Sequence, residues 1–192
     1  MQKTATQVLT LESRSAEWAR NAALVVGGSL FVALCARITI PLPFTPVPLT
    51  LQNFGVLVVG FTLGSRRGFA ALLLYLAEGA VGLPVFNPNG MGGIAQLFGV
   101  TGGYLLAYPF VAALAGWLFE RGKKSFARAA IAGALAEALL FASGISWLWI
   151  YTHSMTQALR FGLFAFLFAE VLKIAAAAAV ATGWKRGQNA PA

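Results

Sequence analysis

Two charged residues in an otherwise apolar segment near the C-terminus could bind a polar ligand. Glu170 and Lys173 stand three apart in FAEVLKIA, so a helix would place them on one face. A carboxylate accepts hydrogen bonds and an ammonium donates them, so the pair offers a ligand one group of each kind. Charge inside a membrane is costly and marks function by default, although a structural ion pair that fixes helix packing is the alternative.

Amide side chains in the middle of the chain form a second group of candidates. Asn87 and Asn89 flank a proline in PVFNPNGMGGIAQLFGVTGGY, a stretch at residues 84–104 that has six glycines and no charge. An amide offers both a donor and an acceptor, which suits an uncharged polar group, although both residues could equally be turn residues. Weaker candidates of the same kind are Gln52, Asn53 and Tyr104.

Several other polar or aromatic side chains stand within the apolar runs or at their ends. Arg37, near the end of the first run, could meet an anionic ligand group or extend to lipid headgroups. Trp147 belongs to an aromatic cluster that is typical of the membrane interface, although one ring of it could line a pocket. For Glu78 and Glu137 we expect a structural role, with contact to a partner subunit as the alternative.

The composition indicates a membrane protein. Of 192 residues, 58% are hydrophobic and 10% are charged, and the mean hydropathy is +0.74. A soluble domain carries about 25% charged residues, so we expect a polytopic membrane protein in which residues 1–192 form one domain. The net charge of +8 could indicate a protein that binds nucleic acid. The positions of the charges predict membrane topology instead, so we expect no nucleic-acid partner.

Six apolar runs approach the roughly 20 residues that a membrane-spanning helix needs. They cover residues 21–40, 49–63, 69–83, 103–119, 129–151 and 164–184. We therefore expect an all-α membrane protein with six transmembrane helices, a polar leader at residues 1–20 and a tail at residues 185–192. The glycine-rich stretch is too irregular for a continuous helix and too apolar for a solvated loop. We interpret it as a lid or re-entrant element, with a plain linker as the alternative.

Lysine and arginine are distributed unequally between the two sides of the expected bundle. Eleven of the 14 fall in the leader, in the links after the second and fourth runs, and after the sixth run. The positive-inside rule places these residues, and both termini, in the cytoplasm. The proline-rich PLPFTPVP, the glycine-rich stretch and THSMTQALR then share the outer face, where they would cap an outward-facing pocket.

The sequence lacks the motifs of several catalytic classes. It has no phosphate-binding loop, no nucleophile elbow and no zinc-type Cys/His cluster, so we expect no enzyme, no metal site and no ATPase motor within the chain. Small residues at four-residue spacing, Ser29 and Ala33, suit close helix contact, either with another membrane protein or inside the bundle. Membrane lipid is an expected contact, and a homo-oligomer is left open.

Three segments carry a resemblance to a known family. ARITIPLPFTPVPLTLQ, LLLYLAEGAVGLPVF and TGGYLLAY, within residues 36–108, resemble the BioY family, the biotin-specific S-components of energy-coupling factor (ECF) transporters. The resemblance continues more weakly through GISWL and the acidic residue three before a lysine in the last run. It implies a six-helix bundle with an outward-facing biotin pocket capped by loops, in the bacterial cytoplasmic membrane.

The resemblance also implies partners and a mode of action. The family binds biotin with high affinity and works with a transmembrane coupling protein (the T-component) and two ATPase subunits; biotin is the transported ligand and no cofactor is expected. The alternatives are a stand-alone biotin carrier without the ATPase module, or the same scaffold binding another vitamin.

The resemblance assigns roles to particular residues. In the family, an acidic residue and a lysine of the last helix contact biotin, and the matching positions are Glu170 and Lys173. An asparagine of the glycine-rich loop would match Asn87 or Asn89. The family typically has Asp where Glu170 stands, preceded by Pro-Gly, whereas this chain has Phe168 and Ala169.

The charge distribution predicts which loops can be labelled from outside the cell. In a Cys35→Ala background, a cysteine introduced beside Lys123 should resist a membrane-impermeant thiol reagent, whereas cysteines between Asn87 and Val100 should react. The measurement is labelling of intact cells, with opened cells as the control for reactivity. Labelling beside Lys123 from the outside would overturn the topology.

Overall fold

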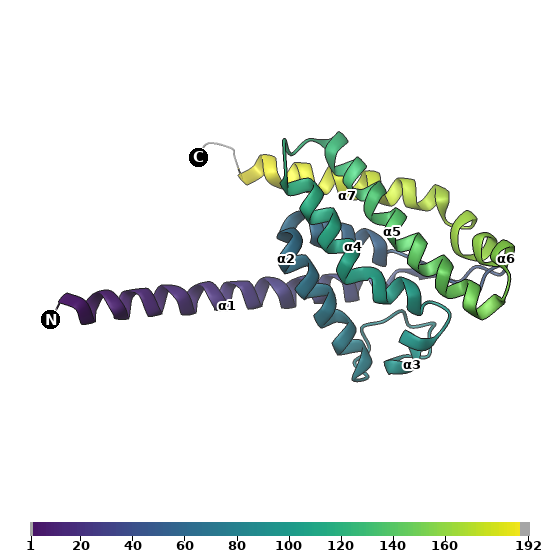
Figure 1. Ribbon diagram of the computed structural model, residues 1–192, viewed down its shortest axis with the longest axis horizontal. Helices are drawn as coiled ribbons and strands as arrows, with labels where there is room; N and C mark the ends of the chain where they lie inside the picture. The colour runs from purple at the N-terminus through teal and green to yellow at the C-terminus, as the bar shows by residue number, and fades with distance from the viewer. Residues whose placement is uncertain (1, 189–192) are drawn as a thin grey trace.

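The protein is mostly helical (Figure 1). A computed structural model describes the backbone of residues 2–188 and the side chains of residues 14–183. The long helices are α1 (Gln2–Arg37), α2 (Gln52–Ala80), α4 (Gly102–Glu120), α5 (Phe126–Thr152) and α7 (Leu167–Gln188). The short elements are strands β1 (Thr39–Ile40) and β2 (Leu49–Thr50), helices α3 (Gly93–Phe98) and α6 (Met155–Leu159), and the π-helix η1 (Arg160–Phe164).

The described helices include several that can cross a membrane by length and composition. Residues 14–37 of α1, together with α2, α4 and α5, meet both criteria. A fifth candidate is the pair Met155–Phe164 and Leu167–Gly183, whose axes meet at 41°. The expectation of a helical membrane protein is therefore confirmed with four to five candidate spans in the described part of the chain, where the sequence predicted six.

The difference between six and five arises from a break inside α2. Gly64 has φ 82° and ψ 176°, which lies outside the helical region and is open mainly to glycine. The break divides α2 into legs of residues 52–63 and 65–80, close to the second and third apolar runs. The Glu120 carboxylate accepts a hydrogen bond from the Ser65 backbone N–H (3.4 Å), so α4 satisfies the exposed start of the second leg.

Glycine allows α2 and α4 to approach backbone to backbone. A Cβ added at Gly60 would lie 2.5 Å from the Ala112 carbonyl oxygen, and one added at Gly116 would lie 2.6 Å from the Ser65 backbone nitrogen. Small residues allow this approach in membranes, where packing rather than water drives helix association. The surrounding core is apolar and includes Val56, Leu57, Phe61, Val111, Ala112 and Phe119.

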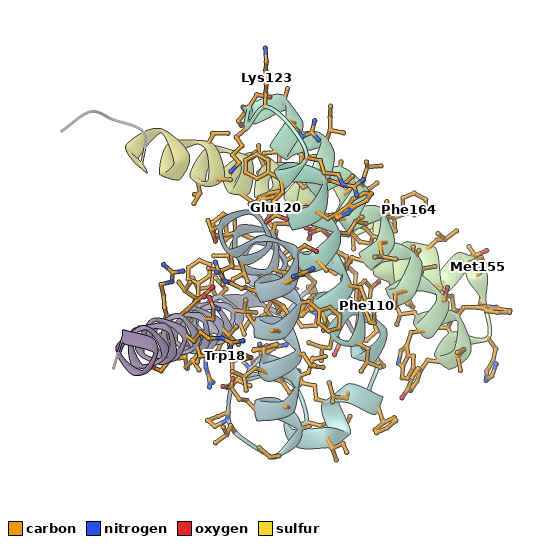
Figure 2. The ribbon with its side chains drawn as sticks, turned by 60° about the vertical axis from the view of Figure 1, so that its left-hand side comes forward. Trp18, Phe110, Glu120, Lys123, Met155 and Phe164 are labelled. Carbon is orange, nitrogen blue, oxygen red and sulfur yellow. The ribbon has the colours of Figure 1, made fainter. Side chains whose placement is uncertain are left out.

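The two ends of the bundle differ in character. The N-terminal end of α1, which projects beyond the bundle, and the C-terminal end of α7 both lie at the left of Figure 1. The link between β1 and β2 lies beside α6 at the right, and the Thr45 hydroxyl donates a hydrogen bond to the Phe161 carbonyl (2.8 Å). Figure 2 shows Lys123, in the α4–α5 link, far from Met155, at the start of α6. The irregular PLPFTPVP and THSMTQALR segments thus gather at one end, away from the chain termini.

Several predicted boundaries are corrected by the structure. The first run ends as a helix at Arg37, because Thr39 and Ile40 pair with Thr50 and Leu49 in an antiparallel β ladder that the sequence did not predict. The last run was predicted from residue 164, but that residue ends η1, and α7 begins only at Leu167.

Ser29 is fully buried and donates a hydrogen bond to the Glu78 carboxylate, so this small residue packs α1 against α2 inside the bundle.

The contact between α2 and α4 predicts a contrast between two glycines. Gly60→Ala should lower the free energy of unfolding by about 1–3 kcal/mol, because the new methyl group has no room beside Ala112. Gly27→Ala is the matched control, since a Cβ there meets no atom within 4 Å, and it should leave stability equal or slightly higher. Thermal unfolding of the detergent-purified variants is the measurement. Equal unfolding temperatures would contradict this account of the packing.

Candidate functional site

A polar cavity lies between α2, α4, α5 and α7, close to the irregular end of the bundle. Its volume is about 50 Å³, and we call it the inner cavity. Its polar lining residues are Thr50, Gln52, Asn53, Asn87, Gln96, Thr101, Tyr104, Tyr108, Glu170 and Lys173. Its apolar lining residues are Val47, Pro48, Leu105, Phe141 and Phe166. Such a mixture of rings and a few convergent polar groups is typical of small-molecule sites.

The charged part of the inner cavity is one buried ion pair. Lys173 Nζ lies 2.7 Å from Glu170 Oε1, and the two residues are only 9% and 4% exposed. Their spacing of three residues on α7 brings the groups together, as the sequence predicts. Glu170 Oε2 is buried and has no hydrogen-bond partner among the described residues, so the pair keeps an acceptor that a ligand could use.

Hydrogen bonds fix the neutral side chains of the cavity wall. The Tyr108 hydroxyl donates to Asn53 Oδ1 (3.0 Å), which joins α4 to α2. Gln52 Nε2 donates to the Tyr75 hydroxyl (2.6 Å) inside α2. The Tyr104 hydroxyl donates to the Gly162 carbonyl in η1 (2.9 Å). These bonds hold the wall in place, because each polar group would otherwise be buried without a partner.

The glycine-rich stretch forms the part of the wall that is nearest the end of the bundle. Asn87 Oδ1 accepts from the Asn89 backbone N–H (3.0 Å), which makes a local turn, and Gln96 Oε1 accepts from the Gly92 N–H (3.1 Å). Trp147 Nε1 donates to the Gly99 carbonyl (2.9 Å), and the Tyr151 hydroxyl donates to the Phe98 carbonyl. Two aromatic side chains of α5 therefore hold the end of α3 against the bundle.

A second, outer cavity adjoins the first. Its volume is about 500 Å³. Its lining residues are Pro46, Pro48, Asn87, Asn89, Gly90, Met91, Gln96, Gly99, Val100, Thr101 and Tyr151. Pro48, Asn87, Gln96 and Thr101 line both cavities, so these four residues form the boundary between them. The proline-rich and glycine-rich segments thus line both cavities, and the buried ion pair belongs to the inner one.

The structure brings most of the predicted site residues together. Glu170, Lys173, Asn87, Tyr104 and Gln52 line the inner cavity, and Asn89 lines the outer one. Arg37 and Trp147 line neither of these cavities: Arg37 is exposed at the end of α1, and the Trp147 N–H is used to hold α3.

Sequence reasoning did not single out several residues of the wall. Tyr108 follows Tyr104 by one helical turn, so helical spacing alone would have placed both on one face of α4. Gln96 is the one amide in GIAQLF, an otherwise apolar segment, and this signal was available too. Thr101, Phe141 and Phe166 carry no distinguishing pattern, because residues of these types are common throughout the chain.

Known proteins resemble this chain over most of its length. The BioY family model matches residues 2–189. "Biotin transporter BioY" of Thermotoga maritima is 34% identical over 163 residues, 85% of this chain and 95% of the relative. "Biotin transporter BioY2" of Lactococcus lactis subsp. cremoris is 36% identical over 151 residues, 78% of this chain and 81% of the relative. A crystal structure of the S-component for biotin from an ECF-type ABC transporter has the same fold, with a TM-score of 0.80 at 24% identity, covering 89% of this chain and 93% of that one.

The aromatic contacts of α5 predict how the glycine-rich stretch can be loosened. Trp147→Phe keeps a ring but removes the donor to the Gly99 carbonyl, so amide hydrogen exchange across α3 should become faster. Trp149→Phe, at a half-exposed position of the same helix, is the matched control and should leave exchange in α3 unchanged. Unaltered exchange in both variants would mean that this hydrogen bond does not hold α3.

Proposed function

The chain belongs to the BioY family, and we propose that it binds biotin and takes it up across the bacterial cytoplasmic membrane as the substrate-binding subunit of an ECF transporter. One observation carries the proposal: a buried Glu170–Lys173 pair faces a polar cavity in a chain whose relatives are named biotin transporters. The fold shared with an S-component for biotin supports it.

The chemistry of biotin matches the groups that line the cavities. Its ureido ring carries N–H donors and a carbonyl acceptor, and its valerate chain ends in a carboxylate. Glu170 can accept from a ureido N–H through the oxygen that has no partner, and the Asn87 amide can serve either kind of group. Lys173 lies beside Glu170, so it can donate to the ureido carbonyl at the same end of biotin. Arg37 and Arg160, the other cations considered for the carboxylate, are exposed and line neither cavity.

The volumes of the cavities suggest how a ligand of this size is accommodated. The inner cavity, about 50 Å³, is far smaller than the roughly 300–1,000 Å³ of common ligand pockets, whereas the outer cavity, about 500 Å³, falls in that range. We infer that biotin occupies the outer cavity and extends one end into the inner one. Asn87 and Gln96, which line both, would then contact it where it passes from one cavity to the other.

The orientation in the membrane follows from charge. If the two legs of α2 cross separately, the chain spans the membrane six times and both termini share one side. Basic residues of the α2 break and of the α4–α5 link, such as Arg66 and Lys123, belong to that side, which the positive-inside rule makes cytoplasmic. Both cavities would then open toward the outside, where biotin is captured.

The partners and the alternatives follow from the same assignment. As an S-component, the chain would dock to a transmembrane T-component and two ATPase subunits, since its sequence contains no phosphate-binding loop of its own. The alternative is a stand-alone carrier, and uptake of labelled biotin in cells that lack any coupling module distinguishes the two. A different vitamin is the second alternative, favoured only by Glu170 at a position where the family typically has Asp.

The ion pair predicts the response of biotin affinity to two substitutions. Glu170→Gln should weaken binding by about 1.5–3 kcal/mol, the range for a hydrogen bond to a charged group, which is roughly ten- to a hundredfold or more in affinity. Lys173→Ala should weaken binding comparably, because it removes the buried cation of the inner cavity. Titration of biotin into the folded, detergent-purified variants measures both effects.

The control separates ligand contact from structural support. Lys124→Ala removes an exposed cation of the α4–α5 link and should leave affinity unchanged. A purely structural ion pair makes a different prediction: Lys173→Ala would lower the unfolding temperature while the remaining folded protein binds biotin normally. Unchanged affinity in both Glu170→Gln and Lys173→Ala would exclude this pair as the binding site.

A further inference from the structure

A third buried charged group lies close to the site but does not line either cavity. Glu137 of α5 is 2% exposed, and neither of its carboxylate oxygens has a hydrogen-bond partner among the described residues. The contrast with Glu78 is clear, since that carboxylate accepts a hydrogen bond from Ser29 between α1 and α2. A buried carboxylate without a partner destabilises the fold, so its presence asks for a functional reason.

The packing of α5 against α7 places Glu137 beside the ion pair. The two helices lie side by side and run in opposite directions (Figure 1). They meet closely at Gly133, where an added Cβ would lie 3.1 Å from Ile174 Cγ2. One turn farther along α5 is Glu137, and one turn back along α7 is Glu170, so the antiparallel register sets the two at the same level. Glu137 therefore lies near the Glu170–Lys173 pair without forming an ion pair with Lys173 in the described part of the chain.

The donors and acceptors of this cluster do not balance. Lys173 has three N–H donors, and the one hydrogen bond that it makes to the described residues goes to Glu170 Oε1. Three carboxylate oxygens are buried without a partner in the described part of the chain: Glu170 Oε2 and both oxygens of Glu137. Lys173 pairs with Glu170 alone among the described residues, and it has donors left for a second carboxylate.

We propose that Glu137 is a positioning residue that keeps the Lys173 charge compensated when a ligand engages Glu170. The inference rests on the proposed function. A ligand N–H that binds Glu170 Oε2 draws on the same carboxylate charge that Lys173 pairs with through Oε1, and a buried ammonium whose ion pair is weakened is unfavourable. Glu137, on the neighbouring helix, supplies a second carboxylate toward which Lys173 turns. Binding then leaves Lys173 shared between two carboxylates, so that no charge is uncompensated.

The proposal predicts opposite effects on stability and on binding. In the empty protein Lys173 already pairs with Glu170, so the Glu137 carboxylate is in excess, and Glu137→Gln should leave the unfolding temperature equal or higher. In the complex the same variant deprives Lys173 of its second partner, so biotin affinity should fall by about tenfold or more. A merely structural glutamate would show the reverse pattern, with lower stability and unchanged affinity.

The experiment compares five variants by biotin titration and thermal unfolding in detergent. Glu137→Gln tests the role, and Glu137→Asp, which keeps the carboxylate, should recover most of the lost affinity. Glu78→Gln is the matched control: it removes a membrane carboxylate that pairs with Ser29, and it should change stability and not affinity. In a Lys173→Met background, adding Glu137→Gln should change affinity by less than about twofold, because the group that it serves is gone.

Each outcome either supports or overturns the proposed role of Glu137. Loss of affinity in Glu137→Gln without loss of stability, together with no further loss in the Lys173→Met background, supports the proposal. Normal affinity in Glu137→Gln, equal losses in both backgrounds, or a variant that no longer folds would overturn it. A wild-type protein that does not bind biotin would instead mean that the proposed function fails, and this result is visible before any variant is made.

Discussion

The ion pair between Lys173 and Glu170 is the interaction on which the site depends. A lone charge at this depth would be expensive, and the two groups are tolerated because they pair at 2.7 Å inside a bundle that excludes lipid. Such a pair contributes little net stability compared with apolar side chains of the same size. In the proposed function its value lies in specificity, since it would present a charged acceptor and a charged donor to a ligand in the cavity.

The close packing of the bundle is what holds this pair in place. Gly60 and Gly116 bring α2 and α4 into backbone contact, and the break at Gly64 turns α2 back on itself so that both legs can pack beside α4. Rigid helices then carry the polar side chains, while the proline-rich and glycine-rich segments close over them. This division suits a binding protein, because rigid helices preorganise the contacts.

The sequence predicted the helical membrane class, the approximate helix positions and most of the polar cavity residues, because hydropathy, charge placement and helical spacing are local signals. It did not predict the β1–β2 ladder or the π-helix η1, which depend on contacts between segments distant in the chain, such as Thr45 with Phe161. Trp147 shows the same limit. The Trp147 side chain is of a type that often lines pockets. Only the fold reveals that its N–H donates a hydrogen bond to the Gly99 carbonyl. The charge of Glu137 is evident in the sequence, but its proximity to Lys173 depends on how α5 packs against α7.

The most direct test of the account is a titration of labelled biotin into the purified wild-type protein in detergent, with other vitamins as competitors. The account predicts saturable binding of one biotin per chain, displaced by unlabelled biotin and unaffected by an excess of the other vitamins. Absence of saturable binding by a folded protein, or displacement by a different vitamin, would contradict the assignment of biotin to this cavity.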